Sequence, residues 1–523
     1  MNHFMRTLAA GAMLATVCPA LAGGILTNTN QSIDFLRNPA RDAAIGLDGV
    51  YSNPAGVVFM PEGFHLAFNW QYAHQTRTIK SENPVFALGR KNGGRTEKTF
   101  EGVADAPFIP SLQAAYNKGD WSVQFNFSVP GGGGKCEFAD GLGSFESVVG
   151  SIARQLGGLD QLATSLGQTA PGVNGYDMDG YMQGRQYYYG FQLGAAYKVK
   201  ENLSVYGGLR LLYGTATYKA KISNIQVSTA GGYVNFGSFM QSATAMVDGG
   251  LSYVGSSLEQ VNAGMAQLEA MGATSAPQYA ELAATRQQLE QANATLQSTS
   301  TSLNALQKYS QGVNLLCNQS SVGIAPVIGA DYRFGRFNVA AKYEFKTQIR
   351  MKNESTVNEA SEIAAVNKFR DGEEVNEDAP AQLAVGVQWS PVDEVRLNLG
   401  YHHFFDKDAD WYNNSQELLD HDSNEFLAGA EWDINDRLTV SAGGQLTRYG
   451  LTDSYMNDMS FVVNSYSLGF GFKYQASDNV KLSAAYFQTN YSNYDRVTSA
   501  QPLVSDSFTR TNRVLGLGCE LNF

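Results

Sequence analysis

The sequence lacks the long apolar run from which a membrane helix is built. Beyond its amino-terminal stretch, no segment reaches the roughly 18 uncharged apolar residues that such a helix requires, which excludes a helical bundle in a bilayer. Charged residues make up only 16% of the 523 residues, and the formal net charge is −12. Because the chain offers no basic stripe to phosphates, nucleic acid is not expected as a partner.

The amino-terminal segment has the pattern of an export signal. Arg6 precedes the apolar run LAAGAMLATV, and the small residues ALA at 20–22 precede Gly23. We therefore expect a signal peptide over residues 1–22 and a mature chain that starts near Gly23. A lipid attached at Cys18 is the alternative, but Val17 stands where a small residue is expected.

Glycine and aromatic residues are abundant instead, with 54 Gly, 27 Tyr and 28 Phe. Many lie in segments that alternate between apolar and polar residues, which is the period of a β-strand with two different faces. In WSVQFNFSV, which begins at Trp121, every second side chain is apolar. About fourteen segments alternate in this way, an even number that suits a closed barrel. They lie near 62–80, 109–117, 121–130, 186–199, 203–219, 321–334, 336–351, 380–389, 395–405, 424–433, 437–449, 464–475, 479–491 and 511–523.

The links between these segments are of two classes. Short, turn-like links (NKGD, KEN, FG, SPVDE, NDR and ASDN) alternate with long ones. Bacterial outer-membrane barrels distribute their connections in this way, with the short turns on the periplasmic side. An open sheet edge would leave backbone groups unpaired in hydrocarbon, so the sheet must close. We therefore predict an all-β transmembrane protein over residues 61–523, an antiparallel barrel of about fourteen strands in the bacterial outer membrane.

The carboxy-terminal segment indicates what the outer faces of the strands meet. Leu515, Leu517, Cys519, Leu521 and Phe523 share one face, which we assign to outer-membrane lipid, with Phe523 in the aromatic girdle. The barrel-assembly machinery is the expected partner of this strand. A soluble periplasmic sandwich is the alternative, but it needs no crowding of aromatic residues at strand ends.

Two of the long links have helical spacing. Residues 131–185 contain DGLGSFESVVGSIARQLGGLDQLATSLG, and residues 221–320 contain leucine at every seventh position over one stretch. We expect helical insertions outside the membrane, the second of them an antiparallel hairpin. This hairpin is either a cap on the barrel mouth or a site for a partner. The leucines are Leu282, Leu289, Leu296 and Leu303.

The segment between the signal and the first strand is rich in small and turn-forming residues, and its expected place is the lumen. It contains Asn53, Pro54, Ala55 and Gly56. A plug with Asn-Pro-Ala ahead of a fourteen-stranded barrel resembles the FadL/TodX family of outer-membrane transporters for long-chain fatty acids and hydrocarbons. The resemblance implies a plug over residues 23–60, passive uptake of hydrophobic small molecules past it, and sideways release where the third strand is kinked.

Two further features bear on such transport. At the end of the third segment, proline lacks a donor and glycine runs pair weakly, so the strand should break or bend, as a flexible loop or as a functional gap. These residues are Pro130, Gly131, Gly132, Gly133 and Gly134. Lumen-facing cations are candidates to orient a fatty-acid carboxylate, although wet lumens carry charges in any case. They are Arg210, Lys342, Lys346 and Arg350.

Cysteine pairing follows from the same pattern. Cys136 and Cys317 both lie in long outer loops next to strand ends, whereas Cys519 alternates onto the lipid face. We predict a disulfide between Cys136 and Cys317, with two free thiols as the alternative.

Other functions can be weighed by what they require. A general porin has no plug, and an energised siderophore receptor needs about twenty-two strands. No serine and histidine constellation is present, so we expect no enzyme. His402 and His403 face opposite sides of a strand, which gives little support to haem binding, and we expect no metal or cofactor. A general porin and a barrel that binds surfaces through its helical loops stay open as alternatives, and so does the identity of the substrate.

Overall fold

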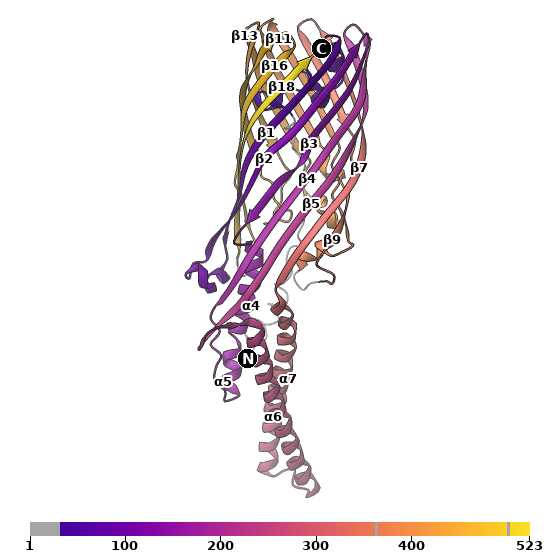
Figure 1. The fold of residues 1–523 in the computed structure, drawn as a ribbon. Coiled ribbons are helices and arrows are strands. Elements are labelled where there is room, and N and C mark those ends of the chain that lie inside the picture. Colours follow the sequence, from indigo (N-terminus) through magenta and orange to yellow (C-terminus); the bar gives the residue numbers. More distant parts are fainter. Residues whose placement is uncertain (1–31, 361–363, 499–502) are drawn as a thin grey trace.

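The computed structural model describes residues 32–360, 364–498 and 503–523. The predicted signal peptide and residues 23–31 of the predicted plug lie outside the described residues. The strands form one antiparallel wall (Figure 1), which closes because β18 Ser505–Asn522 pairs with both β16 Val480–Tyr491 and β1 Gly63–Glu82. A closed wall leaves no membrane-facing edge of unpaired backbone groups.

Fourteen strands build the wall in the described parts of the chain, which confirms the predicted barrel. Successive wall strands are neighbours in the barrel. They are β1, β2 Glu97–Lys118, β3 Trp121–Phe138, β4 Tyr176–Lys200, β5 Leu203–Thr229, β7 Val313–Phe334, β8 Phe337–Glu344, β11 Gln382–Val392, β12 Val395–Phe404, β13 Ser423–Asn435, β14 Leu438–Arg448, β15 Ser465–Ser477, β16 and β18. Four short strands extend the outer loops, namely β6 Gly232–Asn235, β9 Arg350–Ser355, β10 Glu374–Asn376 and β17 Tyr494–Val497.

Several wall strands are longer than the alternation predicted. β2 begins at Glu97 rather than near residue 109, and β4 begins at Tyr176 rather than near 186. These added parts lie at the long-loop end of the barrel, where the outward side chains are polar. Hydrophobic alternation disappears there, although the backbone ladder continues, so the sequence pattern did not reveal them.

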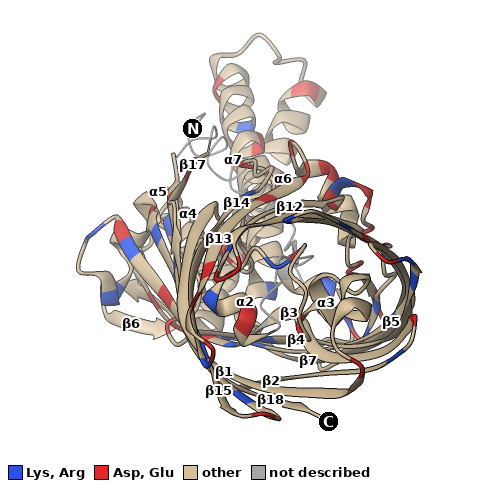
Figure 2. Cartoon of the chain, turned by 90° about the horizontal axis from the view of Figure 1, so that it is seen from above, with Lys and Arg blue, Asp and Glu red and all other residues tan. Residues whose placement is uncertain are grey.

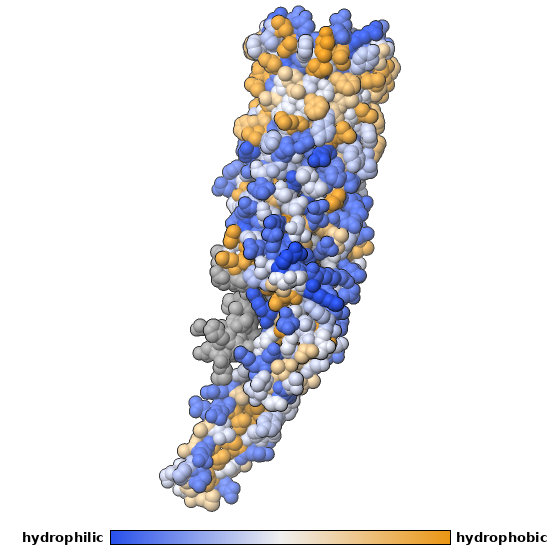
Figure 3. Space-filling model, turned by 90° about the vertical axis from the view of Figure 1, so that its left-hand side faces the viewer, coloured by the Kyte–Doolittle hydropathy of each residue, from blue (hydrophilic) through white to orange (hydrophobic). Residues whose placement is uncertain are grey.

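Apolar side chains gather near the short-turn end on the face of the barrel that Figure 3 shows, and the wall beyond them is mostly polar. Strands around the whole wall carry exposed apolar residues, for example Leu193 of β4, Leu399 of β12 and Leu468 of β15, and we call this zone the apolar band. On β15, Leu468 is 57% exposed and its neighbour Ser467 is 4% exposed, as alternation between lipid and lumen requires. Tyr466 and Tyr474 stand at either end of the apolar stretch on this strand. Tyrosine at the two limits of such a band is typical of the girdles where a barrel meets lipid headgroups.

The wall is closed at its short-turn end by backbone contact between the first and last strands. The Phe523 N–H donates to the Phe64 carbonyl at 2.9 Å, and the Phe64 N–H donates to the Phe523 carbonyl at 3.2 Å. Gly63 has φ +124°, and a Cβ there would lie 2.1 Å from the Phe523 oxygen. Only glycine fits this close approach.

Residues 32–60 fill the lumen at the level of the apolar band. They form α2 Ile33–Arg37, α3 Gly49–Ser52 and the 3₁₀ turn η1 Gly56–Phe59. The Ser32 side chain caps α2 by accepting from the Phe35 N–H at 3.1 Å. Figure 2 shows α2 and α3 inside the ring of strands, as the predicted lumenal plug requires. We call residues 32–60 the plug.

Long helices stand outside the barrel, at the end opposite to the short turns (Figure 1). They are α4 Gly143–Leu156, α5 Leu159–Ser165, α6 Phe236–Ala270 and α7 Pro277–Gln307. The predicted hairpin is confirmed, because α6 and α7 pack along each other and the leucine-repeat residues Leu296 and Leu303 are buried. In the described residues, no helix combines the length and apolarity needed to cross a membrane.

Short 3₁₀ turns complete the outer loops. They are η2 Pro84–Leu88, η3 Arg90–Asn92, η4 Lys308–Gln311, η5 Ala364–Phe369, η6 Asp406–Asp408 and η7 Tyr412–Leu418.

The interior of the polar part of the wall is apolar. One continuous cluster joins inward side chains of the long strands to the outer loops and to α4 and α6. We call this cluster the outer apolar core. Its members include Ile79, Phe100, Ala104, Cys136, Tyr188, Tyr218, Phe461 and Phe508. The interior of the barrel therefore has a mainly apolar outer half and a plugged, polar inner half.

Candidate functional site

Buried ion pairs fix the first half of the plug to the wall. Glu431 of β13 accepts from Arg37 at 2.7 Å and from Arg41 at 2.9 Å. Within the plug, Arg41 also pairs with Asp48 at 2.7 Å, and Arg37 pairs with Asp34. Removing one partner of such a buried set leaves an uncompensated charge, so these contacts hold α2 in a defined position.

The Asn-Pro-Ala-Gly turn fixes the second half. Asn53 donates through Nδ2 to the Asp331 carboxylate of β7 at 2.6 Å, and its Oδ1 accepts from the Gly56 N–H at 3.2 Å. A Cβ on Gly56 would lie 2.9 Å from the Asp331 oxygen and 2.4 Å from the Asn53 amide nitrogen. The turn therefore requires both its asparagine and its glycine.

The two middle residues of this turn reach other strands through their carbonyl groups. The Pro54 carbonyl accepts from Gln124 of β3 at 2.7 Å, and the Ala55 carbonyl accepts from Ser204 of β5 at 2.7 Å. All four predicted plug residues therefore lie in a single turn that is bonded to three wall strands. Gln124 thus bonds the plug directly to β3.

His402 links the wall to the plug. It lies buried on β12, where its two ring nitrogens face Glu425 at 2.9 Å and Asp42 of the plug at 2.8 Å. His403 points to the other face of the strand, as predicted. In the described part of the chain, no group of three or more His, Cys, Asp or Glu side chains has the arrangement of a metal site.

Two of the predicted carboxylate-binding cations already have partners. Arg210 lies in the lumen and pairs with Glu344 of β8, with 2.7 Å between Nη1 and Oε1. Lys342 donates to the Tyr51 carbonyl of the plug at 3.0 Å and lies over the Tyr51 ring. The wall and the plug thus share these two cations.

The other two predicted cations lie elsewhere. The Lys346 ammonium donates to the Asp408 carbonyl at 2.9 Å and lies 3.7 Å from the Asp378 carboxylate, in the outer loops. Arg350 is exposed at the start of β9, because the strand is interrupted after Glu344 and its alternation restarts at Arg350. The structure therefore does not bring the four residues together.

Strand β3 separates from β2 at the predicted proline and glycine positions. The two strands pair up to Leu112 and Phe127 and resume pairing at Ala104 and Cys136. Between these points, residues 105–111 and 128–135 have no mutual pairs among the described residues. We call this stretch the β2–β3 break.

Strand β3 stays attached to β4 along the break. Bulges lie between Ser128 and Gly131 and between Gly132 and Gly134. Gly132 has φ +102° and Gly134 has φ +69°, values that few other residues adopt. The bend is thus built into the β3 backbone.

Strand β2 contributes to the break as well, which the sequence analysis missed. Pro107 and Pro110 stand within it and cannot donate to a ladder. The Pro107 carbonyl instead accepts from the Trp70 indole at 2.9 Å. The signal was visible in the sequence, since ADAPFIPS precedes an otherwise regular alternation.

The break lies beside both the lipid band and the plug. At its inner end, the rings of Phe127 and Phe191 lie 5.0 Å apart on the lipid side, and Phe108 is 62% exposed. On the lumen side, Ala106 and Ile109 of β2 pack against an apolar cluster that joins α2 to the wall. The outer apolar core begins at the other end of the break, where Ala104 and Cys136 are members of it.

The predicted disulfide is wrong, because Cys136 and Cys317 are both free and buried. Cys136 lies in β3, and Cys317 lies in β7. Strands β4 and β5 stand between them, so the two residues are three strand spacings apart, or about 14 Å along the wall. Both residues had been placed in loops because the outer parts of the strands were not recognised.

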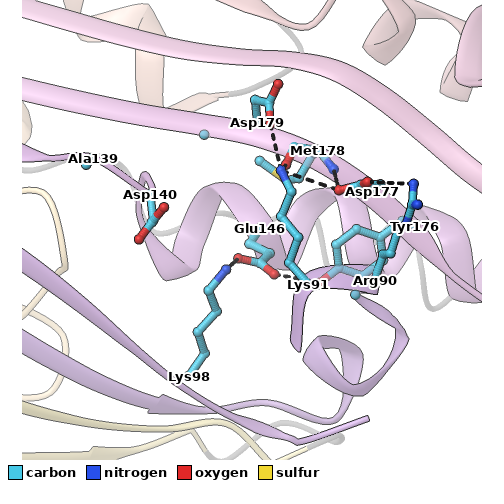
Figure 4. Close-up of a pocket in the computed structure, with 12 residues that line it drawn as sticks. Arg90, Lys91, Lys98, Ala139, Asp140, Glu146, Tyr176, Asp177, Met178 and Asp179 are labelled. Atoms are coloured by element: carbon cyan, nitrogen blue, oxygen red, sulfur yellow. Dashed lines mark hydrogen bonds and ion pairs between the residues drawn. The ribbon is translucent and has the colours of Figure 1, made fainter. Parts of the chain in front are cut away.

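A cavity of about 250 Å³ among the outer loops is polar (Figure 4). Lys98 pairs with Glu146, which also accepts from the Tyr176 hydroxyl at 3.1 Å. Lys91 pairs with Asp179 at 2.6 Å. Since its cations face carboxylates, this cavity does not suit a hydrophobic solute.

Comparisons with known proteins support the fold. No protein-family model and no curated protein matches the sequence. Among solved structures, the chain is similar to a FadL homologue of Pseudomonas aeruginosa, with a TM-score of 0.55 and 11% identity over 96% of this chain and 100% of that one. It is also similar to the toluene transporter TodX of P. putida, with a TM-score of 0.50 and 13% identity over 91% and 94% of the two chains. At these identities the likeness shows a common fold, a plugged fourteen-stranded barrel.

Proposed function

Starting from the fold that this chain shares with the FadL homologue and TodX, we propose that it is a passive transporter of the bacterial outer membrane. Its substrates are hydrophobic or amphipathic small molecules such as long-chain fatty acids. They enter the outer apolar core from outside and leave sideways, through the β2–β3 break, into the membrane. No catalytic step is involved.

The β2–β3 break is the observation that carries this proposal. Unpaired backbone is costly next to hydrocarbon, at several kcal/mol for each unsatisfied group, so a wall strand that bends away from its neighbour is not expected without a function. Here prolines on both strands prevent regular pairing across the break. They are Pro107 and Pro110 on β2 and Pro130 on β3. The break also lies where the outer apolar core ends.

The plug supports release to the side over passage straight through. Below the break, the lumen is occupied by α2 and by buried ion pairs that link the plug to the wall. A hydrophobic solute that continued downwards would have to displace charged groups from their partners. Exit through the wall instead moves it from one apolar surrounding to another.

A reversible staple across the break tests this route. A Cβ on Gly134 would lie 3.6 Å from that of Ala106, within the range of Cβ separations of disulfides. We expect Ala106→Cys with Gly134→Cys, in a Cys136→Ser background, to take up labelled oleate slowly when oxidised. Reduction should restore uptake in the same protein, which separates the staple from the cost of the substitutions.

A matched staple outside the break provides the control. Ala104 lies opposite Cys136 in a part of the ladder that is already paired, so Ala104→Cys places a disulfide there without closing anything. Its uptake should not depend on oxidation. Oxidised Ala106→Cys/Gly134→Cys protein that takes up oleate at the reduced rate would contradict sideways release. Uptake of a small sugar in place of oleate by the parent protein would favour a general porin.

A further inference from the structure

Two arginines face each other inside the barrel just beyond the β2–β3 break. Arg77 of β1 lies directly opposite Arg510 of β18 in the antiparallel register. Their neighbours of the same parity, Ile79 and Phe508, are fully buried members of the outer apolar core. Both guanidinium groups are therefore directed inward.

Neither arginine has an acidic partner in the part of the chain that the structure describes. Their Nε atoms are buried and find no hydrogen-bond acceptor there. Arg510 makes only long contacts, at 3.4 Å to the Phe461 carbonyl and 3.4 Å to the Gln75 amide oxygen. By contrast, the lumenal Arg37, Arg41 and Arg210 are all paired with carboxylates.

The surroundings of the pair are aromatic and apolar. Arg77 lies over the Phe461 ring at 6.0 Å, and Arg510 lies over the Tyr491 ring at 5.2 Å. Like charges directly opposite each other on neighbouring strands are destabilising. Each side chain is half-buried, and the burial of its Nε without an acceptor adds the cost of lost hydration. The cost of this arrangement is removed when an anion binds between the two side chains.

The pair also stands at the start of the proposed exit. Arg77 lies opposite Gly102 on β2, two residues before Ala104, where the pairing with β3 stops. An anionic group held there would leave an attached hydrocarbon chain in the outer apolar core and next to the break.

From this geometry we infer that Arg77 and Arg510 bind the carboxylate of an amphipathic monocarboxylic acid. The inference rests on the proposed function and specifies its substrate class, namely long-chain fatty acids in preference to neutral hydrocarbons. Guanidinium groups suit this role, because each offers paired donors that match the two oxygens of a carboxylate. The predicted cations Arg210 and Lys342 are not available in the same way, since Glu344 and Tyr51 engage them.

Binding measurements on the purified protein in a nonionic detergent test the inference. Oleate and its methyl ester have the same chain, and only oleate carries the charge. We expect Arg77→Gln and Arg510→Gln each to weaken oleate binding by about tenfold, since a hydrogen bond to a charged group contributes roughly 1.5–3 kcal/mol. Methyl oleate should bind the parent and both variants with one common, lower affinity.

Arg513→Gln is the matched control, because Arg513 lies on the same strand but is exposed on the outer face. It should leave oleate binding unchanged. Lysine variants at 77 and 510 keep the charge and should retain part of the preference for oleate. A variant that had simply failed to fold would lose that preference completely.

Equal affinity of the parent for oleate and methyl oleate, or unchanged oleate binding by the glutamine variants, would overturn the inference. If cells still take up both compounds in that case, the proposed transport stands without the arginine site. If cells take up neither compound, the transport proposal itself fails.

Discussion

The direction in which a side chain points decides what a substitution at that position does. Leu468 is exposed on the apolar band of β15, with Tyr466 before it and Phe470 after it. We expect Leu468→Arg to destabilise the folded barrel by about 2 kcal/mol, because arginine on the lipid face is costly inside the band. Urea unfolding in lipid vesicles measures this difference.

Thr511→Arg is the control, because Thr511 is exposed on the outer face of the wall beyond the band. We expect that variant to unfold at the parental urea concentration. Equal destabilisation by both arginines would mean that the band does not face lipid.

Asp406 of η6 gives a pH-dependent prediction. Its side chain is fully buried, and burial raises the pKa of its carboxyl from 3.8 to about 7. The folded state therefore binds a proton that the unfolded state has released, so stability falls as the pH rises from about 4 through about 7. We expect this residue to contribute a decline of up to about 1.4 kcal/mol per pH unit.

The Asp406→Asn variant tests this assignment, because it keeps an acceptor for the Ser423 N–H, which lies 3.0 Å from Oδ2, but cannot ionise. Its free energy of unfolding should vary less between pH 5 and pH 8 than that of the parent. Identical slopes for the two proteins would show that another group titrates.

Residue positions inside the barrel were only partly predictable from the sequence. Alternation on one strand correctly placed Arg210 and Lys342 toward the lumen. Their partners, Glu344 and Tyr51, come from another strand and from the plug, and a pattern along one segment contains no information on such contacts. The opposed pair of Arg77 and Arg510 was missed for the same reason, since the register of β1 with β18 joins residues more than 400 positions apart.

At the scale of elements, the plug is expected to control passage without supporting the wall. Asn53→Ala with Pro54→Ala removes the bond to Asp331 and frees the backbone of the turn. We expect a folded, heat-modifiable barrel whose oleate uptake is several-fold lower. Asn202→Ala, in the exposed turn between β4 and β5, should leave uptake unchanged. If the plug variant takes up oleate at the parental rate, the turn has no part in transport.

The hairpin of α6 and α7 can be shortened by removing equal lengths of its two helices. Gly250 lies against Leu296, and Gly264 lies against Leu282, so residues 258 and 288 are nearly opposite each other. The first turns of α6 belong to the outer apolar core, through Phe236 and Met240. We expect replacement of residues 258–288 by a short glycine and serine turn to preserve folding and oleate uptake.

Uptake lost from the shortened protein, with its barrel still folded, would show that the distal hairpin takes part in transport. Unchanged uptake together with lost attachment to a surface or partner would support the alternative in which the hairpin is a binding device.

Element boundaries were predicted well only where lipid imposes alternation. The short turns lie where the sequence placed them, for example between β7 and β8 and between β15 and β16. Alternation does not predict the outer parts of β2, β3, β4, β5 and β7, because both of their faces depart there from a simple apolar and polar pattern. The wrong disulfide prediction is a direct result of that error.

At the scale of the whole molecule, the architecture was predictable because three independent constraints agree. Alternation gave the strand number, the two classes of links gave the orientation of the hairpins, and the absence of apolar helices excluded the other membrane fold. The β2–β3 break was predictable in part, since Pro130 and the glycines indicated it on one side. Its relation to the outer apolar core depends on contacts between distant strands.

The closure of the wall between β1 and β18 also has a consequence for how the protein is made. Residues 63–82 pair with residues 505–522, so the first strand to leave the ribosome waits for its neighbour until nearly all of the chain has been synthesised and exported. During that time the edge of β1 that pairs with β18 has no partner, and an unpaired strand edge is prone to aggregate. Closure of the wall between β1 and β18 therefore follows the export of nearly the whole chain. A ribosome that stalls before residue 505 produces a chain without β18, the strand that joins β16 to β1, so its wall stays open.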